Sequence, residues 1–524
     1  MNTVSVLDCT LRDGGYCNQW KFGFQNIKRI ITELINAKID IIECGFLTNR
    51  VEYDRGISKY TDINQLGEII PSGDARERFV VMVNYGEYEV DTIVNCSEAP
   101  IGGIRLAFHK KDYKDALQQC RMLKEKGYRV FVQPMVSMNY SDDEFVDLIR
   151  CANEVEPYAF YIVDSFGTMK RQQLFHYIQL VKKHLKESIV LGFHSHNNFQ
   201  FAFSNAIDLV EQNTTRDLII DTSVYGMGRG AGNLNTELFI NELNMERKCD
   251  YAIKPLVSIM DEILNRFYKE NPWGYSFPNY LSAAYGIHPN YATFLCEKDT
   301  LTIDAIDDIF SIMDKEKMVE FDPKYVEHLY EDYMSREKVN DEHIDEFRSM
   351  LSGRTILLIA PGKTAEVENK QIRDFIEQES ALVISINHEY EKVTPDYVFV
   401  SNMRRFKKLS KDVYEKTLVT SNIKSTGVYM KLNYYLLLND IPAVRENAGL
   451  MAINLLKQME CKDIWLAGYD GYDYAASNNY ESDDMVLSMS REQVDQINAG
   501  MKQMIEDYSQ AINIRFLTDS RLNV

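Results

Sequence analysis

The sequence predicts an α/β protein with a (β/α)8 barrel, a helical extension and a second, doubly wound α/β domain. Eight short apolar runs alternate with amphipathic stretches over residues 1–245, apolar residues then recur at helical spacing over 246–350, and strand-like runs return over 351–524. Strand–helix alternation repeated eight times is typical of a parallel barrel. A length of 524 residues also exceeds one ordinary domain.

The predicted barrel strands are rich in Val and Ile, as strands that are buried on both faces should be. They are Val4–Leu7, Ile39–Glu43, Phe79–Val83, Gly103–Ala107, Arg129–Pro134, Ala159–Val163, Ile189–Phe193 and Leu218–Ser223. Helical patterns separate them, and in Asn26–Ala37 the apolar residues fall on one helical face. These patterns place the barrel at residues 1–245.

The rest of the chain divides into a helical part and a strand-rich part. Tyr251–Arg266 and Ile303–Met313 have helical spacing, and the charged segment Asp322–Met350 is expected to be a helical connector. The later strand-like runs are Ile356–Ala360, Ala381–Ile386, Asp396–Ser401, Thr417–Thr420, Asp463–Ala467 and Asn513–Leu517. Helical stretches such as Ala448–Met459 separate several of them, which predicts a Rossmann-like domain over residues 351–524.

Composition limits the classes of partner. A formal charge of −20 argues against a nucleic-acid backbone and an anionic membrane surface. No apolar stretch reaches the roughly 18 residues that span a bilayer, and the N-terminus shows no leader pattern. The nine cysteines are scattered singly, which is typical of a reduced protein. We therefore expect a cytoplasmic protein without membrane or nucleic-acid partners, and leave a homo-oligomer open.

Two polar motifs at predicted strand ends indicate a metal site. His194-Ser195-His196 ends the seventh run, and Arg12-Asp13 follows the first. Residues two apart on a strand point the same way, so both imidazoles can face one point. Two His and one carboxylate with open positions suit a catalytic divalent metal. A His-x-His pair alone is more often a packed or surface pair than a metal site, and an Arg-Asp pair alone is usually a salt bridge in a loop. The presence of both pairs at strand ends favours a metal site.

Three motifs in order resemble one enzyme superfamily. They are Asp8-Cys9-Thr10-Leu11-Arg12-Asp13-Gly14-Gly15, His194-Ser195-His196-Asn197-Asn198 and Gly228-Arg229-Gly230-Ala231-Gly232-Asn233. Over about residues 1–300 the chain resembles the metal-dependent aldolase/lyase superfamily of TIM barrels (the pyruvate carboxyltransferase-like domain), with 4-hydroxy-2-oxovalerate aldolase as the nearest member. The resemblance implies a class II aldolase that cleaves or forms a carbon–carbon bond of a 4-hydroxy-2-oxo acid.

The resemblance also implies roles for individual residues. Asp13, His194 and His196 would hold the divalent metal, and Asn233 matches a further ligand of some relatives. Mn2+ or Mg2+ is favoured over Zn2+, because these motifs supply no thiolate ligand. Arg12 would stabilise the oxygen of a pyruvate enolate, since its guanidinium is permanently charged and can aim two donors at it.

The sequence departs from the aldolase pattern at the general base. Close aldolases carry a His three residues after the metal Asp, where this chain has Tyr16. A phenol with an ordinary pKa of about 10 is a poor base at pH 7. Tyr291, which matches an aldolase tyrosine, is the first candidate for the base and Tyr16 the second, although Tyr291 is equally well explained as a packed side chain. A third option is that the acceptor and the reaction differ from those of the aldolases.

Three more polar residues at barrel strand ends are candidates for substrate contact. They are Glu43, Gln133 and Ser165. A hydrogen bond inside the barrel explains each of them equally well.

The second domain carries weaker signals. Pro361-Gly362-Lys363-Thr364 lacks the spacing of a P-loop. Short motifs at 395–402, 446–449 and 465–472 resemble nucleotide-sugar-binding domains of sialyltransferase type, which implies a nucleotide or nucleotide-sugar site with Asn402 and Asp470 at strand ends. A docking or oligomerisation domain is the alternative.

Two other functions remain open for the whole chain. One is an acyl-CoA-condensing acyltransferase of the isopropylmalate synthase type. The other is a catalytically altered barrel that serves as a binding or scaffold domain in surface-glycan biosynthesis, for which the substitution at Tyr16 leaves room. Metal binding distinguishes the last from an enzyme, because a binding-only barrel need not retain a metal.

Overall fold

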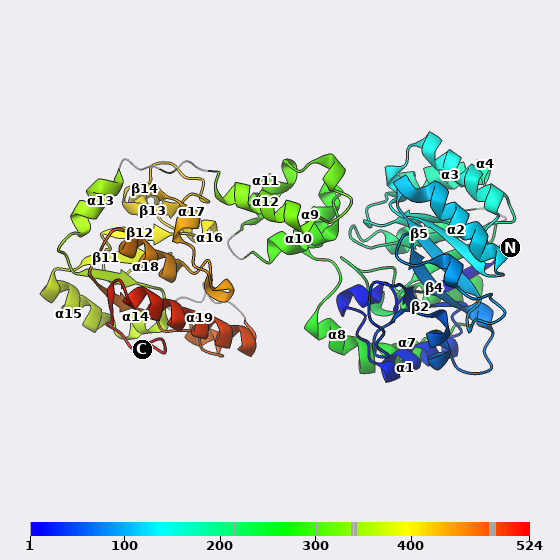
Figure 1. Cartoon of the computed structure of the whole chain (residues 1–524), viewed down its shortest axis with the longest axis horizontal. Coiled ribbons are helices and arrows are strands. Elements are labelled where there is room, and N and C mark those ends of the chain that lie inside the picture. Colours follow the sequence, from blue (N-terminus) through cyan, green and yellow to red (C-terminus); the bar gives the residue numbers. More distant parts are fainter. Residues whose placement is uncertain are drawn as a thin grey trace. The chain divides into compact units, whose positions relative to one another are not determined.

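The computed structural model describes residues 2–212, 216–298, 301–336, 339, 343–480 and 489–523. The chain divides into two compact units (Figure 1). Unit 1 comprises Met1–Thr293 and Asp314–Phe321, and unit 2 comprises Phe294–Met313 and Asp322–Val524. Each unit contains one parallel sheet.

The sheet of unit 1 is a closed barrel, which confirms the predicted (β/α)8 architecture. Its eight strands are all parallel, and β1 closes the barrel by pairing with both β9 and β2. Around the barrel they run β1 (Val4–Asp8), β9 (Leu218–Thr222), β8 (Val190–Ser195), β7 (Ala159–Asp164), β6 (Arg129–Pro134), β5 (Gly103–Phe108), β4 (Phe79–Asn84) and β2 (Ile41–Leu47). The two-residue strand β3 (Lys59–Tyr60) pairs with β2 outside the closed ring. All eight predicted strands are present, with ends within two residues except at β2, which continues to Leu47.

An outer ring of helices covers the barrel. It consists of α1 (Phe24–Asn36), α2 (Tyr113–Glu125), α3 (Asp142–Val155), α4 (Arg171–His184), α5 (Ala202–Glu211) and α6 (Thr236–Arg247). In α1, residues 27, 30, 31 and 34 are buried, which is the spacing of one helical face. Helix α3 begins at a capping box in which the Ser141 and Glu144 side chains satisfy each other's backbone amides.

Two layers of apolar residues fill unit 1. One layer lies between the strands and the outer helices. The other includes Leu7, Val80, Phe131, Tyr161 and Ile219, which come from alternating strand positions and fill the barrel interior. Side chains therefore fill the barrel interior, and a ligand-binding site can lie only at an end of the barrel.

Helices follow the barrel. They are α7 (Lys254–Ile259), a π-helical turn at Met260–Leu264, α8 (Asn265–Glu270), α9 (Phe277–Tyr285), α10 (Pro289–Cys296), α11 (Ile303–Ser311), α12 (Pro323–Met334) and α13 (Ile344–Leu351). The segment expected as a helical connector, Asp322–Met350, contains α12 and most of α13, and both belong to unit 2. Helix α12 begins where Asp322 accepts hydrogen bonds from two backbone amides and Pro323 fixes the first turn.

Unit 2 contains a seven-stranded parallel sheet, which confirms the predicted doubly wound domain. In spatial order its strands are β14 (Met430–Leu432), β13 (Thr417–Thr420), β12 (Tyr397–Val400), β11 (Leu382–Ile386), β10 (Ile356–Ile359), β15 (Asp463–Ala467) and β16 (Asn513–Phe516). Both faces of β10 are fully buried. From β10 to β14, successive strands are added on one side of β10, and β15 and β16 are then added on its other side. The gap between β10 and β15 is therefore the topological switch point of the sheet.

The sequence did not predict β14, because a strand of three residues is too short to show a period. The helices of this sheet are α14 (Lys363–Val367), α15 (Asn369–Glu379), α16 (Met403–Phe406), α17 (Tyr434–Leu437), α18 (Ala448–Gln458) and α19 (Arg491–Ser509). Over the whole of the described chain, none of the helices combines the length and apolarity needed to cross a bilayer.

Candidate active site

Asp13, His194 and His196 converge at the carboxyl end of the barrel. Each offers one ligand atom, and these three atoms lie within 4.8 Å of one another. His194 lies in β8, and His196 follows it directly, held by an antiparallel bridge to Asn233. The two imidazole rings are 5.2 Å apart and nearly perpendicular. The structure therefore brings together the three residues expected to hold a metal.

Asn233 provides a fourth oxygen beside this group. Its Nδ2 donates to Oδ2 of Asp13 and, at 3.2 Å, to the carbonyl of Met227. Its Oδ1 is buried and has no hydrogen-bond partner among the described residues. A buried carbonyl oxygen without a donor is costly unless a ligand satisfies it. The amide oxygen, the carboxylate and the two imidazoles form a mixed oxygen and nitrogen donor set that fits a divalent metal ion.

The protonation states also suit metal binding. Burial lowers the pKa of His196 to about 3, although the charge of Asp13 opposes the shift. Burial alone would raise the pKa of Asp13, but the charges of His196 and Arg12 outweigh it and hold the pKa well below its usual range. At pH 7 the imidazole is neutral and the carboxylate ionised, which are the forms that coordinate metal.

A chain of buried charges connects the two sides of the site. Arg12 donates to Oδ1 of Asp13 at 2.7 Å and to Oε2 of Glu43 at 2.8 Å. The same Glu43 oxygen lies 3.0 Å from Nη1 of Arg105, whose Nη2 binds Asp221. Asp221 in turn accepts a hydrogen bond from Nδ1 of His194 at 3.0 Å.

This chain of charges positions its end members. Arg105 is fully buried and joins two carboxylates across the barrel interior. The bond to Asp221 places the proton of His194 on Nδ1, so Nε2 is the nitrogen left to bind a ligand. Sequence reasoning missed Arg105 and Asp221. The sequence did contain a signal for both residues, because each is a charged residue within an otherwise apolar strand.

The two candidate bases have different surroundings. Tyr291 is fully buried, and its hydroxyl lies 2.8 Å and 2.9 Å from the backbone carbonyls of Lys317 and Glu320. The hydroxyl proton of Tyr291 is therefore already donated to backbone carbonyls. Tyr16 packs edge-on against Trp20, and the Arg229 guanidinium lies 5.3 Å from its ring. The role of either tyrosine as the base stays a prediction.

The Tyr16 phenol is protonated at neutral pH. Desolvation of its hydroxyl end raises the pKa, and the positive charge of Arg229 offsets only part of this effect. The residue as a whole is 42% exposed, so the ring edge reaches solvent.

The three candidates for substrate contact also differ. The carboxylate of Glu43 bridges two arginines, as described above. Ser165 accepts a hydrogen bond from the amide of Val136 at 2.9 Å, and Val136 has the left-handed φ of +51° that a β-branched residue rarely adopts. Gln133 ends β6, and its buried Nε2 has no partner in the described structure. Of the three, Gln133 has an uncommitted donor for a ligand.

Two further polar residues lie near the site and were not predicted to belong to it. Nη1 of Arg229 lies 3.2 Å from Nε2 of His288, and His288 stacks on Phe321. Arg229 lies within the glycine-rich motif Gly228–Asn233, and His288 directly precedes Pro289. Nothing in the local pattern marked either as a site residue.

The residues singled out in unit 2 have local partners. Asn402 caps α16 by accepting from the amide of Arg404 at 2.8 Å. Asp470 lies beyond β15 at the switch point and accepts from the amide and the hydroxyl of Thr364. Their part in nucleotide binding stays a prediction.

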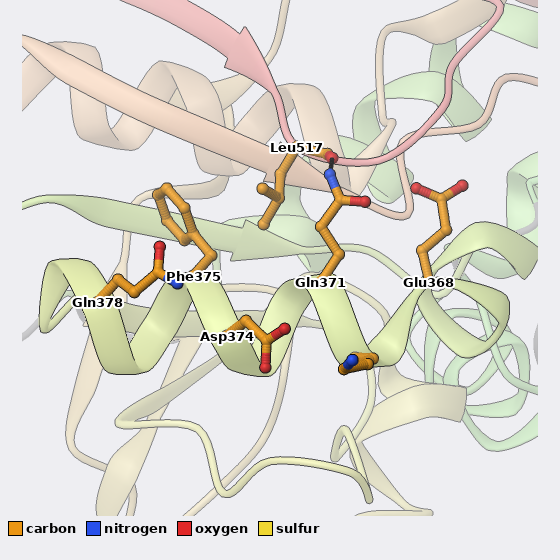
Figure 2. Close-up of a pocket in the computed structure, with 7 residues that line it drawn as sticks. Glu368, Gln371, Asp374, Phe375, Gln378 and Leu517 are labelled. Atoms are coloured by element: carbon orange, nitrogen blue, oxygen red, sulfur yellow. Dashed lines mark hydrogen bonds between the residues drawn. The ribbon is translucent and has the colours of Figure 1, made fainter.

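A surface hollow elsewhere in unit 2 runs along α15 (Figure 2). Glu368, Lys370, Gln371, Asp374, Phe375, Gln378 and Leu517 line it. Gln371 donates to the carbonyl of Leu517 at 2.7 Å. The hollow includes neither Asn402 nor Asp470.

Comparisons with known proteins match the barrel. A family profile described as HMGL-like matches residues 3–262. The 4-hydroxy-2-oxovalerate aldolase of Geobacillus genomosp. 3 is 25% identical over 245 residues, covering 46% of this chain and 70% of that protein. The oxaloacetate decarboxylase of Mycobacterium tuberculosis is 25% identical over 285 residues, covering 52% and 81%.

Solved structures are also similar. Among them is the N-terminal domain of an aldolase candidate from Bacteroides vulgatus, with 24% identity, a TM-score of 0.48 and coverage of 58% of this chain and 99% of that one. The family match ends at residue 262 and gives no support to the sialyltransferase resemblance of residues 351–524.

Proposed function

Because residues 3–262 belong to the HMGL-like family of lyases and aldolases, which act on carbon–carbon bonds, we propose that this chain is a divalent-metal-dependent aldolase for a 4-hydroxy-2-oxo acid. The observation that carries the proposal is the convergence of Asp13, His194 and His196 beside the unpaired amide oxygen of Asn233. The products of cleavage are pyruvate and an aldehyde.

The metal would be held by these four residues, with Mn2+ or Mg2+ as the ion. When bound, the ion supplies a Lewis acid for the 2-oxo group of the substrate. Asp221 orients the imidazole of His194 through Nδ1, so that Nε2 faces the site, and Asn233 orients the Asp13 carboxylate by donating to it. The protein therefore presents a preorganised set of donors.

Arg12 is the residue that we assign to the enolate oxygen. Its Nε and Nη1 are bound to Glu43 and Asp13, whereas Nη2 has no hydrogen bond to any described residue. A guanidinium fixed by two carboxylates loses little conformational entropy when its third nitrogen binds a ligand. Negative charge that develops on the enolate oxygen during cleavage would be stabilised by this donor.

Tyr16 and Gln133 would contact the remaining polar atoms of the substrate. Tyr16 would exchange the proton of the 4-hydroxyl group, and the open amide donor of Gln133 would bind a substrate oxygen. Because the phenol is protonated at pH 7, an aldolase that uses Tyr16 as its base should become faster as pH rises above neutrality.

The test is pyruvate release from a panel of 4-hydroxy-2-oxo acids by the Mn2+-loaded chain. Arg12→Lys should lower kcat/KM by about 10²–10³, because Lys cannot reproduce the planar fork. Tyr16→Phe should lower the rate and remove its alkaline rise, whereas Tyr291→Phe should do neither. Arg55→Lys, which alters an exposed arginine paired with Glu68, is the matched control. Near-normal turnover by Arg12→Lys would remove Arg12 from the reaction.

The oxaloacetate decarboxylase relative motivates a second candidate reaction. Decarboxylation of oxaloacetate also passes through a pyruvate enolate, so the same residues could serve it without a base for a 4-hydroxyl group. Pyruvate from oxaloacetate, with none from any 4-hydroxy-2-oxo acid, would favour this reaction. Release of free CoA thiol from an acyl-CoA would instead identify the condensing acyltransferase.

A further inference from the structure

Arg229 differs from the other two arginines of the site in its partners. Arg12 and Arg105 are each held by two carboxylates. Arg229 is partly buried, its Nη1 is bound to the neutral nitrogen of His288, and its buried Nε has no hydrogen-bond partner among the described residues. No carboxylate of the described chain forms an ion pair with it. Its charge is therefore uncompensated within the described structure.

The neighbours of Arg229 leave its guanidinium without an ion pair. Nη1 of Arg229 lies 3.2 Å from Nε2 of the partly buried His288, and the guanidinium carbon lies 5.3 Å from the centre of the Tyr16 ring. Asp13 lies beside Gly228, which precedes Arg229, but its carboxylate already pairs with Arg12 at 2.7 Å. Among the described residues, the guanidinium of Arg229 therefore has no carboxylate of its own.

The guanidinium is close enough to act on the proposed metal site. The preceding residue, Gly228, lies against that site, since a Cβ atom on Gly228 would be 2.9 Å from Oδ2 of Asp13. A desolvated guanidinium is stable only when an anion pairs with it, and its planar fork matches carboxylate and phosphate oxygens. A ligand bound at Asp13 and His196 can therefore also contact the positive charge of Arg229.

We propose that Arg229 binds a second anionic group of the substrate, a carboxylate or phosphate at the end remote from the 2-oxo acid. The substrate would then be a dianionic 4-hydroxy-2-oxo acid, and the aldehyde product would carry the second charge. This inference rests on the proposed aldolase function, and it names the substrate class of that site. Tyr16 and His288 act as positioning residues, since they flank the guanidinium and fix its plane.

The experiment measures binding of non-cleavable analogues to the Mn2+-loaded full chain. 2-Oxopentanedioate and 2-oxopentanoate have the same five carbons and differ in a terminal carboxylate against a methyl group. Neither carries the 4-hydroxyl group that cleavage requires. The wild type should bind the dianion about 10- to 100-fold more tightly, which is the range of a charge-assisted hydrogen bond.

Variants assign this preference to Arg229. Arg229→Gln should abolish it while leaving the Kd of pyruvate unchanged, and Arg229→Lys should keep part of it. Lys111→Gln is the matched control, because it removes a cation from the same end of the barrel that Glu320 already neutralises. The control should keep the full preference.

Two results would overturn the inference. Equal affinity of the wild type for both analogues would show that no second anion is recognised. An equal loss of affinity for pyruvate and both analogues in Arg229→Gln would show that the guanidinium binds the 2-oxo-acid carboxylate instead. Failure of the proposed function looks different: the preference would persist, but no 4-hydroxy-2-oxo acid would release pyruvate.

Discussion

Asp13 and Asp470 both lie at the carboxyl end of a parallel sheet, but the two carboxylates have different surroundings. Both edges are where ligands bind in their fold classes. At the barrel edge, the Asp13 group leaves an amide oxygen and ligand nitrogens without protein donors. At the switch point of unit 2, the carboxylate of Asp470 is taken up by the amide and hydroxyl of Thr364.

Packing strengthens the contrast. A Cβ atom on Gly362 would lie 2.2 Å from the carbonyl oxygen of Gly468 and against the Asp470 carboxylate, so the two loops at the switch point are in direct contact. The position where this fold type would receive an anion is thus filled by an anion of the chain itself. Donors and acceptors without protein partners therefore identify a site better than a position at a strand end does.

The largest expected effect is on stability, from the charge at the centre of the barrel. Arg105→Met leaves Glu43 and Asp221 buried without their shared guanidinium. Breaking a buried ion pair from one side costs about 3–5 kcal/mol, which urea unfolding at pH 7 would measure. Arg55→Met breaks the exposed pair with Glu68 and should cost at most about 1 kcal/mol. Equal stability of the two variants would contradict the buried network.

The second largest effect is expected on metal affinity, when the hydrogen bond between Asp221 and His194 is weakened. Asp221→Asn keeps the size of the side chain but removes the charge that orients the imidazole. Loss of such a partner lowers metal affinity by about 10- to 100-fold, measured by Mn2+ titration. Asp142→Asn is the control, since Asp142 contacts the exposed His176 at 2.7 Å. An unchanged Mn2+ affinity in Asp221→Asn would show that this hydrogen bond does not organise the site.

The smallest effect is expected in unit 2. Asp470→Asn removes a charge but retains one acceptor for Thr364, so the unfolding free energy should fall by about 1 kcal/mol. Mn2+ affinity should not change. A nucleotide that raises the melting temperature of the wild type would break the comparison, because phosphate near an ionised Asp470 is repelled; in that case Asp470→Asn should bind it more tightly.

Much of this organisation could be predicted because it has a period. Buried parallel strands such as Arg129–Pro134 and Thr417–Thr420 were predicted with their exact bounds. The His194 and His196 pair could be found because both residues lie at the end of one strand. Arg105 and Asp221 could not be assigned, since their partners come from other strands and only barrel closure brings them together. The environment of Tyr291 also depends on distant segments, at residues 317 and 320.

The central claim is that Asp13, His194 and His196, with Asn233, hold one divalent ion. Titration of the purified full chain with Mn2+, followed by electron paramagnetic resonance of the free ion, tests it most directly. One bound Mn2+ per chain is expected in the wild type and in His176→Ala, whose histidine is exposed. None is expected in the His194→Ala, His196→Ala double variant. Stoichiometric Mn2+ in the double variant would show that these residues do not hold the ion.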